Sequence, residues 1–181
     1  MKKNIIKHLT KGRSPNIVDI SKKKETKRIA IAEGFIRFNK KTYNKIAKIK
    51  ISKGEIINVS IISGIMASKK THELIPLCHN IPIENVNIDI KSIDKNQLFK
   101  VICKVSTFAK TGVEMEALTG VSITLLTIYD MCKSINKDMT IENISLIQKT
   151  GGKSGKYIKK WIWKKIQYIQ LFKNSFFIET L

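Results

Sequence analysis

One hairpin decides the fold class: Val86-Asn87-Ile88-Asp89-Ile90-Lys91-Ser92-Ile93-Asp94-Lys95-Asn96-Gln97-Leu98-Phe99-Lys100-Val101-Ile102-Cys103-Lys104-Val105. Apolar and polar side chains alternate over residues 86–90, as in a strand that is buried on one face. Residues 98–105 form a second extended run. Asp94-Lys95-Asn96 lies between the runs and has the residue types of a turn. The sequence therefore predicts two antiparallel strands joined by a hairpin.

Two helical patterns flank this hairpin. Thr111-Gly112-Val113-Glu114 fits a capping box, and apolar residues then recur at helical spacing through Cys132. Ser52-Lys53-Gly54-Glu55 is a second capping box; its helix runs past Met66, and a further helical turn ends before Pro76. Weaker patterns predict strands over 29–38 and 139–147 and a helix over 43–51. Helices of this length beside antiparallel strands predict an α+β fold, with the helices on one face of the sheet.

Length and composition indicate a single cytoplasmic domain. The chain has 181 residues, and no apolar run reaches the roughly 18 residues of a membrane span. Its amino terminus is charged too densely for a signal peptide. The three cysteines form no Cys-x-x-Cys pair, which argues against a disulfide framework or a zinc knuckle. We expect a basic arm over 1–13, a domain over 14–155 and a basic aromatic extension over 156–181 that need not pack on the core.

The net charge of +20 leaves two interpretations open. A basic nucleic-acid-binding module with interleaved aromatic residues would carry such a charge. The charge is spread along the chain, however, and it comes mostly from Lys in a sequence rich in Ile and Asn. That composition is typical of an A+T-rich genome. A polyanionic small substrate is equally compatible with the charge.

Two nucleotide or metal motifs fail on spacing. Gly152-Lys153-Ser154 has the end of a phosphate-binding loop, but the first glycine of that motif would fall at Ile147. His72-Glu73 begins a zinc-protease pattern, whose second histidine would fall at Pro76. We therefore expect no bound metal and no nucleotide cofactor.

Three polar segments remain as candidates for a site. His79 follows a helix stop at Leu74-Ile75-Pro76-Leu77-Cys78, where a structural histidine is the simpler interpretation. Glu114 has a role as a capping-box partner, whereas Glu116 has no local partner. Asp130 and Lys133 are spaced i, i+3, which also fits an ordinary exposed pair worth about 0.3 kcal/mol. Lys53 lies in a first helical turn, where the helix dipole disfavours a cation, so a functional role would explain it.

Together these segments resemble the cyclic pyranopterin monophosphate synthase (MoaC) family. The resemblance runs in order from about Ser14 to Gly155. The blocks that carry it are Val18–Ser21, Thr26–Arg28, Lys53–Gly54, Gly64–Thr71, Glu73–His79, Thr111–Thr119, Leu126–Lys133 and Lys149–Gly155.

The resemblance implies an activity in molybdenum cofactor biosynthesis. Members rearrange a cyclised dihydro-GTP, which a radical enzyme makes, into a tricyclic pyranopterin with a cyclic phosphate and release pyrophosphate, without a redox cofactor. The family also implies a ferredoxin-like fold and a homohexamer, a trimer of dimers with pockets at subunit interfaces. Sequence alone does not exclude a pseudoenzyme.

The resemblance also assigns residues. Asp130, Lys133 and Lys53 match the catalytic positions, and an Asp–Lys pair suits a ring rearrangement that moves protons between atoms. The matched substrate-binding positions are Leu77, Cys78, His79, Met115, Glu116, Lys69 and Arg28. Cations among them would stabilise the charge that gathers on departing pyrophosphate.

Overall fold

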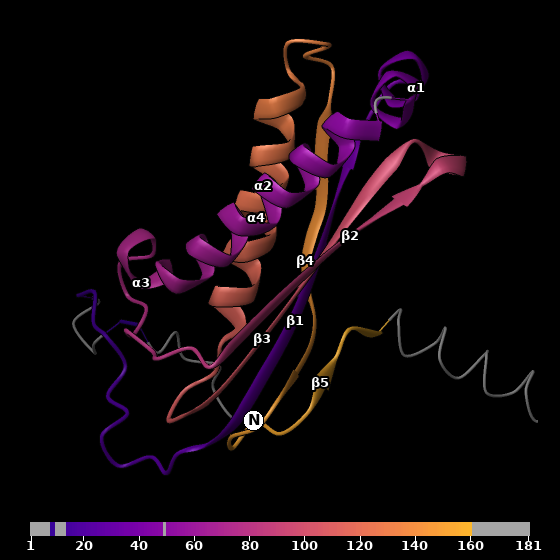
Figure 1. Cartoon of the computed structure of the whole chain (residues 1–181). Coiled ribbons are helices and arrows are strands. Elements are labelled where there is room, and N and C mark those ends of the chain that lie inside the picture. The colour runs from indigo at the N-terminus through magenta and orange to yellow at the C-terminus, as the bar shows by residue number, and fades with distance from the viewer. Residues whose placement is uncertain (1–7, 10–13, 49, 161–181) are drawn as a thin grey trace, which may run out of the picture.

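The chain folds into one antiparallel sheet with its helices packed against it (Figure 1). The computed structural model describes residues 8–9, 14–48 and 50–160, without the side chains of 47–54. In chain order the elements are β1 (Thr26–Arg37), α1 (Lys40–Lys48), α2 (Lys50–Lys69), α3 (Thr71–Leu74), β2 (Asn85–Ile93), the 3-10 helix η1 (Asp94–Asn96), β3 (Leu98–Ala109), α4 (Glu114–Cys132), β4 (Thr140–Thr150) and β5 (Tyr157–Ile158).

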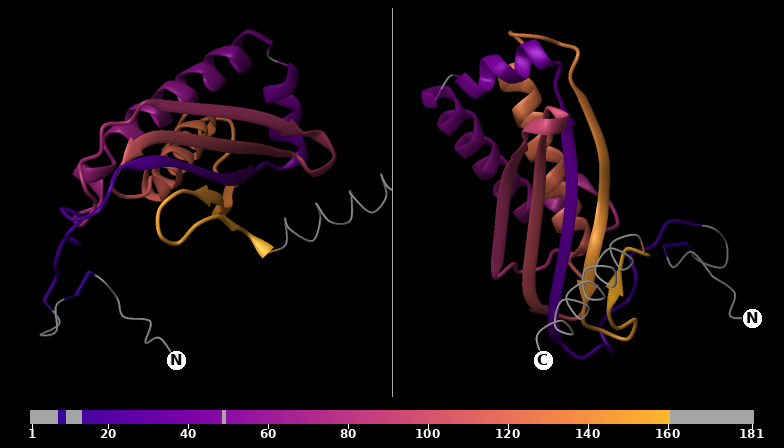
Figure 2. Two further views of the ribbon diagram at one scale, coloured as in Figure 1. Left: turned by 90° about the horizontal axis from the view of Figure 1, so that it is seen from below. Right: turned by 90° about the vertical axis from the view of Figure 1, so that its right-hand side faces the viewer.

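The topology is ferredoxin-like, as expected. The strands lie in the order β2-β3-β1-β4-β5, and every neighbouring pair is antiparallel. The order of the first four strands, with α2 and α4 as the two crossovers, is that of the split βαβ unit. Strand β5 extends this sheet at the β4 edge. The right-hand view of Figure 2 shows the helices on one side of the sheet, which confirms the predicted α+β layers.

Alternating side chains divide each central strand between the two faces of the sheet. In β1, Ala30, Ala32 and Ile36 are fully buried on the helix side, and α4 packs over them. In β3, Val101 and Val105 are equally buried on the same side. The apolar periodicity therefore places the core between the sheet and the layer formed by α2 and α4.

Two glycines allow α2 and α4 to approach closely. A Cβ atom at Gly64 would overlap Thr124 of α4 and Ile88 of β2. A Cβ atom at Gly120 would overlap Ser68 of α2 and Cys103 of β3. Any side chain at either position would push the helices apart, so these two residues fix how closely the helix layer packs.

The structure corrects the two predicted helix starts. Helix α2 begins at Lys50, two residues before the expected cap at Ser52. Helix α4 begins at Glu114, and its N-cap residue is Val113, which makes no side-chain capping bond. Thr111 is therefore not a cap, and the capping-box role proposed for Glu114 is wrong. The expected helix over 43–51 is instead the end of α1 and the start of α2.

The other predicted elements are confirmed, with bounds that differ by a few residues. The hairpin turn is η1, followed by Gln97 in the left-handed conformation at φ 51°. After Gly152 the chain returns to the sheet, because Tyr157 and Ile158 pair with β4, whereas the sequence suggested no such packing. Most of the predicted basic arm, and the extension beyond Lys160, lie outside the described residues.

Candidate functional site

The amino-terminal end of α4 carries a buried carboxylate. Glu116 is only 4% exposed. Burial, with a smaller contribution from the negative charge of Glu114, raises its pKa to about 7. The Ser68 hydroxyl donates a hydrogen bond of 3.0 Å to the backbone carbonyl of Glu116, which ties this turn of α4 to the end of α2. A carboxyl group with this pKa can donate or accept a proton near neutral pH.

The turn after α3 lies beside this carboxylate. Cys78 is half-buried, and burial together with the nearby Glu116 carboxylate raises the pKa of its thiol. His79 is also half-buried, and its Nε2 donates a hydrogen bond of 2.7 Å to the carbonyl of Val18. The neighbouring Leu77 is half-buried too. The structure thus brings the predicted Leu77–His79 turn close to Glu116.

Arg28 lies at the same end of the molecule, where β1 begins. It is 8% exposed, and its Nε and Nη2 donate to the carbonyls of Ala109 and Lys110 at 3.0 and 3.2 Å. Gly152, at φ 73°, leaves room for the guanidinium, since a Cβ atom there would overlap Arg28 Nη1. Arg28 therefore joins the ends of β1 and β3 to the loop after β4. This is a structural role in addition to the substrate-binding role that the resemblance assigns to Arg28.

Lys149 is a residue of this region that sequence reasoning missed. Its Nζ lies 2.8 Å from Glu114 Oε1 and donates a 3.1 Å hydrogen bond to Ser154. Glu114 folds back over Gly112, where a Cβ atom would overlap its carboxylate. Lys149 and Glu114 are far apart in the sequence, so only the strand order could have revealed the pair. Met115, the other predicted residue here, is 38% exposed.

The predicted catalytic pair lies at the opposite end of α4. Lys133 Nζ is 2.5 Å from Asp130 Oδ1, and the side chains are 55% and 68% exposed. The hydrogen bond to Asp130 raises the pKa of Lys133. At about 1.5 Å of rise per residue, Asp130 and Glu116 are about 21 Å apart along the helix. One copy of the chain therefore does not bring these two groups together.

Helix α2 spans the same two ends in the opposite sense (Figure 1). Lys69 is exposed in its last turn, which leads into α3 and the turn that carries His79. Lys53 lies near its first turn, and its side chain is outside the described residues. Apart from Lys53, the predicted site residues thus form two groups. The first, which we call the buried group after its two buried members, Arg28 and Glu116, also comprises Lys69, Leu77, Cys78, His79 and Met115. The second, which we call the exposed pair, is Asp130 with Lys133.

The described part of the chain shows neither a metal cluster nor a membrane span. In it, no three His, Cys, Asp or Glu side chains gather in a way that could hold a metal ion. None of its helices is both long enough and apolar enough to cross a bilayer.

Known proteins match most of the chain. Residues 17–152 match the MoaC family. A relative from Helicobacter pylori strain Shi470, named cyclic pyranopterin monophosphate synthase, is 51% identical over 153 residues, which are 84% of this chain and 97% of the relative. Relatives of the same name from Clostridium botulinum and Listeria welshimeri are 50% and 46% identical, each over 87% of this chain and 99% and 98% of their own lengths. The matches leave part of this chain uncovered while covering almost all of each relative.

Proposed function

The chain belongs to the MoaC family, and we propose that it is a cyclic pyranopterin monophosphate synthase of molybdenum cofactor biosynthesis. As a lyase, it would convert a cyclised dihydro-GTP into a pyranopterin with a cyclic phosphate and release pyrophosphate. The substrate would come from a radical enzyme, its functional partner, in the cytoplasm. Family membership favours this function over a nucleic-acid-binding module.

The family match carries the proposed reaction, and the division of the site between the two ends of α4 carries a proposal about the assembly. The buried group and the exposed pair are about 21 Å apart along the helix, farther than one small substrate reaches. A complete pocket therefore needs the exposed pair of one copy beside the buried group of another. We infer that the active form is an oligomer with pockets between subunits, and the family resemblance suggests a homohexamer.

The helix layer supports such an assembly. Val59, Ile62 and Met66 lie along one face of α2, at i, i+3 and i+7, and are 44%, 57% and 55% exposed. An apolar row of this kind on the surface is typical of a protein–protein contact.

The chemistry follows from the two groups. Asp130 and Lys133 would exchange protons with the rearranging ring, and the carboxyl of Glu116, with its pKa of about 7, could supply or take a proton at neutral pH. Closing the cyclic phosphate forms one bond from a sugar oxygen to phosphorus and breaks the bond to pyrophosphate. Lys53 and Lys69 would stabilise the negative charge on that leaving group. Arg28, whose donors already bind carbonyls, would position the strand ends around the phosphates.

Mixed oligomers test the division directly. Asp130→Asn and His79→Ala each damage one half of the site, so each variant alone should be inactive. If the halves come from different subunits, subunits unfolded and refolded together should regain activity, because some interfaces combine the intact half of each variant. Random mixing should restore about a quarter of the sites.

Two controls make the result decisive. Asp130→Asn mixed with Lys133→Ala should stay inactive, because both changes damage the same half. Wild-type protein taken through the same refolding should recover its activity. Pterin formation from the purified cyclised substrate is the measurement. No recovery in the first mixture, while refolded wild-type protein does recover, would place both halves in one subunit. Native wild-type protein that forms no pterin would reject the proposed function itself.

A further inference from the structure

The imidazole of His79 is held by a backbone carbonyl from a distant part of the sequence. Its Nε2 lies 2.7 Å from the carbonyl oxygen of Val18. A carbonyl oxygen can only accept a hydrogen bond, so the neutral ring carries its proton on Nε2. The other ring nitrogen, Nδ1, is then an acceptor with a free lone pair. This one contact therefore sets the chemical character of both nitrogens.

The segment that supplies the carbonyl is fixed by hydrogen bonds on both sides of Val18. On one side, the Asn16 amide donates to the His8 carbonyl at 2.9 Å. On the other side, the Ser21 amide donates to Asp19 Oδ1 at 2.8 Å. Val18 is half-buried, whereas Asp19 is exposed. These residues include one of the blocks that resemble the family, yet the proposed chemistry uses none of them.

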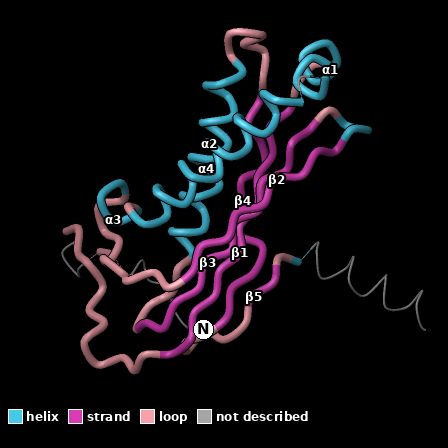
Figure 3. The backbone as a smooth tube through the Cα atoms, viewed as in Figure 1, coloured by secondary structure: helices cyan, strands magenta, loops and turns pink. Residues whose placement is uncertain are grey.

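The loop that carries His79 is constrained as well. The Cys78 amide donates to the Ile75 carbonyl at 3.0 Å, which closes a tight turn just before the histidine. Further along the loop, the Thr107 hydroxyl of β3 donates to the Pro82 carbonyl at 2.6 Å. Figure 3 shows this loop after α3 and the segment before β1 at the same end of the sheet. Both partners of the contact are therefore held in place by the fold.

Nδ1 of His79 is left open to a ligand. Among the described residues, none bonds to Nδ1. In the same part of the chain, no buried side-chain nitrogen or oxygen lacks a hydrogen-bond partner. Nδ1 is therefore not sealed inside the protein but reaches a surface that a ligand can contact. This surface adjoins Cys78, which lies near the Glu116 carboxylate.

An unprotonated Nδ1 discriminates between the parts of the substrate. It accepts a hydrogen bond from an N–H or O–H group, but its lone pair repels an ionised phosphate oxygen. Phosphate groups are largely ionised at neutral pH, so the donors of a nucleotide-like substrate lie on its base and sugar. Lys69, a cation of the same buried group, suits the phosphates instead.

We propose that the Val18 carbonyl holds His79 as a hydrogen-bond acceptor that binds an N–H or O–H group on the base or sugar of the substrate. Val18 is then a positioning residue, which acts through its backbone. The bound group rests on the proposed function, whereas the protonation of the two ring nitrogens does not depend on it.

Nitrogen-15 NMR of the full-length protein, labelled at histidine, tests the protonation. Under mildly alkaline conditions, where a free imidazole is neutral, Nδ1 of His79 should show the downfield shift of an unprotonated ring nitrogen and Nε2 the upfield shift of a protonated one. The loss of both signals in His79→Gln assigns them. A protonated Nδ1, or an average of the two forms, would overturn the proposal.

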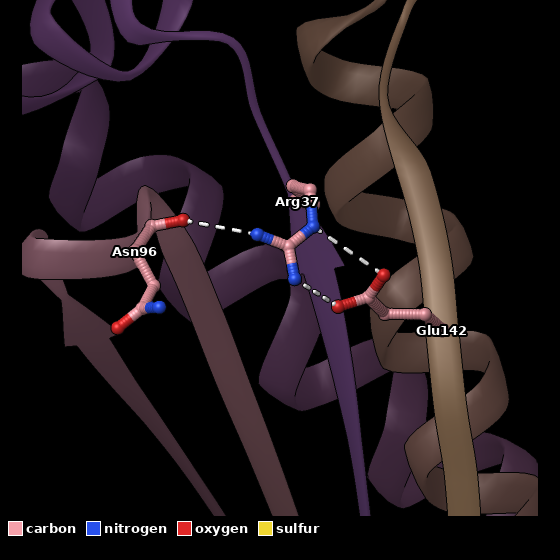
Figure 4. A network of polar contacts seen from close by, with 3 residues as sticks. All are labelled: Arg37, Asn96 and Glu142. Atoms are coloured by element: carbon pink, nitrogen blue, oxygen red, sulfur yellow. Dashed lines mark hydrogen bonds and ion pairs between the residues drawn. The ribbon is translucent and has the colours of Figure 1, made fainter.

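Arg37→Gln is the matched control for these signals. It removes a comparable bond at the far end of β1, where Arg37 Nη1 donates to the Asn96 carbonyl at 3.4 Å and Nη2 lies 2.6 Å from Glu142 Oε1 (Figure 4). The His79 signals should stay unchanged in this variant.

Titration of the labelled protein identifies the group that Nδ1 binds. GTP should shift the Nδ1 signal of His79, and inorganic tripolyphosphate should not. The dideoxy form of GTP, which lacks both ribose hydroxyls, separates the two sources: a retained shift assigns a base N–H, and a lost shift assigns a sugar hydroxyl. An equal shift with tripolyphosphate, or no shift when calorimetry shows GTP bound, would overturn the proposal.

Two substitutions separate the two nitrogens in turnover. In His79→Gln the amide nitrogen can still donate to Val18, but nothing replaces Nδ1. In His79→Asn the amide oxygen can take the place of Nδ1, but the side chain is too short to reach Val18. His79→Gln should keep the melting temperature and raise KM for the cyclised substrate roughly tenfold, as for one lost hydrogen bond, with a smaller change in kcat.

His79→Asn should show the reverse, a lower melting temperature with a smaller rise in KM. Both should retain more activity than His79→Ala, which removes both nitrogens. A wild-type KM in folded His79→Gln would overturn the proposal while pterin formation persists. Wild-type protein that forms no pterin would reject the proposed function, and the NMR result would still decide how His79 is protonated.

Discussion

The two ends of α4 present functional groups in opposite ways. At the amino-terminal end, Glu116 is buried, and Arg28 and His79 are held by hydrogen bonds to backbone carbonyls within the same subunit. At the carboxyl-terminal end, Asp130 and Lys133 pair with each other on an exposed surface. One end is organised by the fold itself. The other has a simple ion pair that gains strength only when substrate or another subunit excludes water from it.

The comparison is sharpest for Asp130. Asp130→Asn should lower turnover by roughly 10²–10⁴-fold, because it removes a proton acceptor while keeping the shape of the side chain. The melting temperature should hardly change, since the side chain is 68% exposed and its pair with Lys133 contributes little to stability. Pterin formation and thermal unfolding measure the two effects. Near-normal turnover in the folded variant would remove Asp130 from the mechanism.

Glu116 should behave in the opposite manner, with a large effect on stability that depends on pH. Its pKa is raised from an ordinary 4.5 to about 7 in the folded protein, so folding favours the protonated form. The wild-type protein should therefore lose stability as pH rises from about 4.5 through 7, by up to about 3 kcal/mol.

Glu116→Gln isolates this loss because glutamine stays neutral. Measured by urea unfolding, the stability of the variant relative to wild type should increase between pH 5 and pH 8. Glu73→Gln, an exposed change on α3, is the control and should show no such trend. A constant difference between Glu116→Gln and wild type across this range would show that the Glu116 pKa is not raised by folding.

Substitution of Lys53 tests whether the start of α2 contributes to catalysis together with the exposed pair. Lys53→Ala should lower turnover by roughly 10- to 100-fold, through lost stabilisation of the leaving pyrophosphate. It should not lower the melting temperature, because a cation near the start of a helix gains nothing from the helix dipole. A clear drop in melting temperature with unchanged turnover would mean that Lys53 is structural.

Truncation after Gly155 should have the smallest effect on catalysis. It removes β5 and everything after it, but every residue with a proposed chemical role precedes it. Turnover should persist, whereas solubility or association should change, because the β4 edge of the sheet loses its pairing with β5. An inactive truncated protein, still folded by circular dichroism, would show that the extension contributes to the pocket.

The sequence predicted the helices and strands themselves better than the residues at which they begin and the contacts between them. Alternation over residues 86–105 and the helical spacing up to Cys132 reflect burial, and the structure confirms both. The predicted caps at Ser52 and Thr111 were wrong. Glu114 pairs with Lys149 on a distant strand, and that contact was invisible to a rule that considers only neighbouring residues.

The same limit applies to the site. The resemblance picked out Glu116 and Asp130 together, but only the length and direction of α4 show that they lie at opposite ends. Lys149 lies in the resembling block Lys149–Gly155, but nothing in that local sequence indicated its pairing with Glu114. The close approach of α2 and α4 at Gly64 and Gly120 likewise depends on packing between elements that are distant in sequence.

The unequal burial of the cysteines makes the protein ready for site-specific labelling. Cys103 and Cys132 are fully buried, and burial raises the pKa of each to about 11, so neither presents a reactive thiolate at the surface. Cys78 is half-buried beside Glu116, and its own raised pKa means that a maleimide or spin label would attach best under mildly alkaline conditions. A label on the unaltered chain would then occupy a predicted substrate-binding position beside Glu116, so bound substrate should slow its attachment.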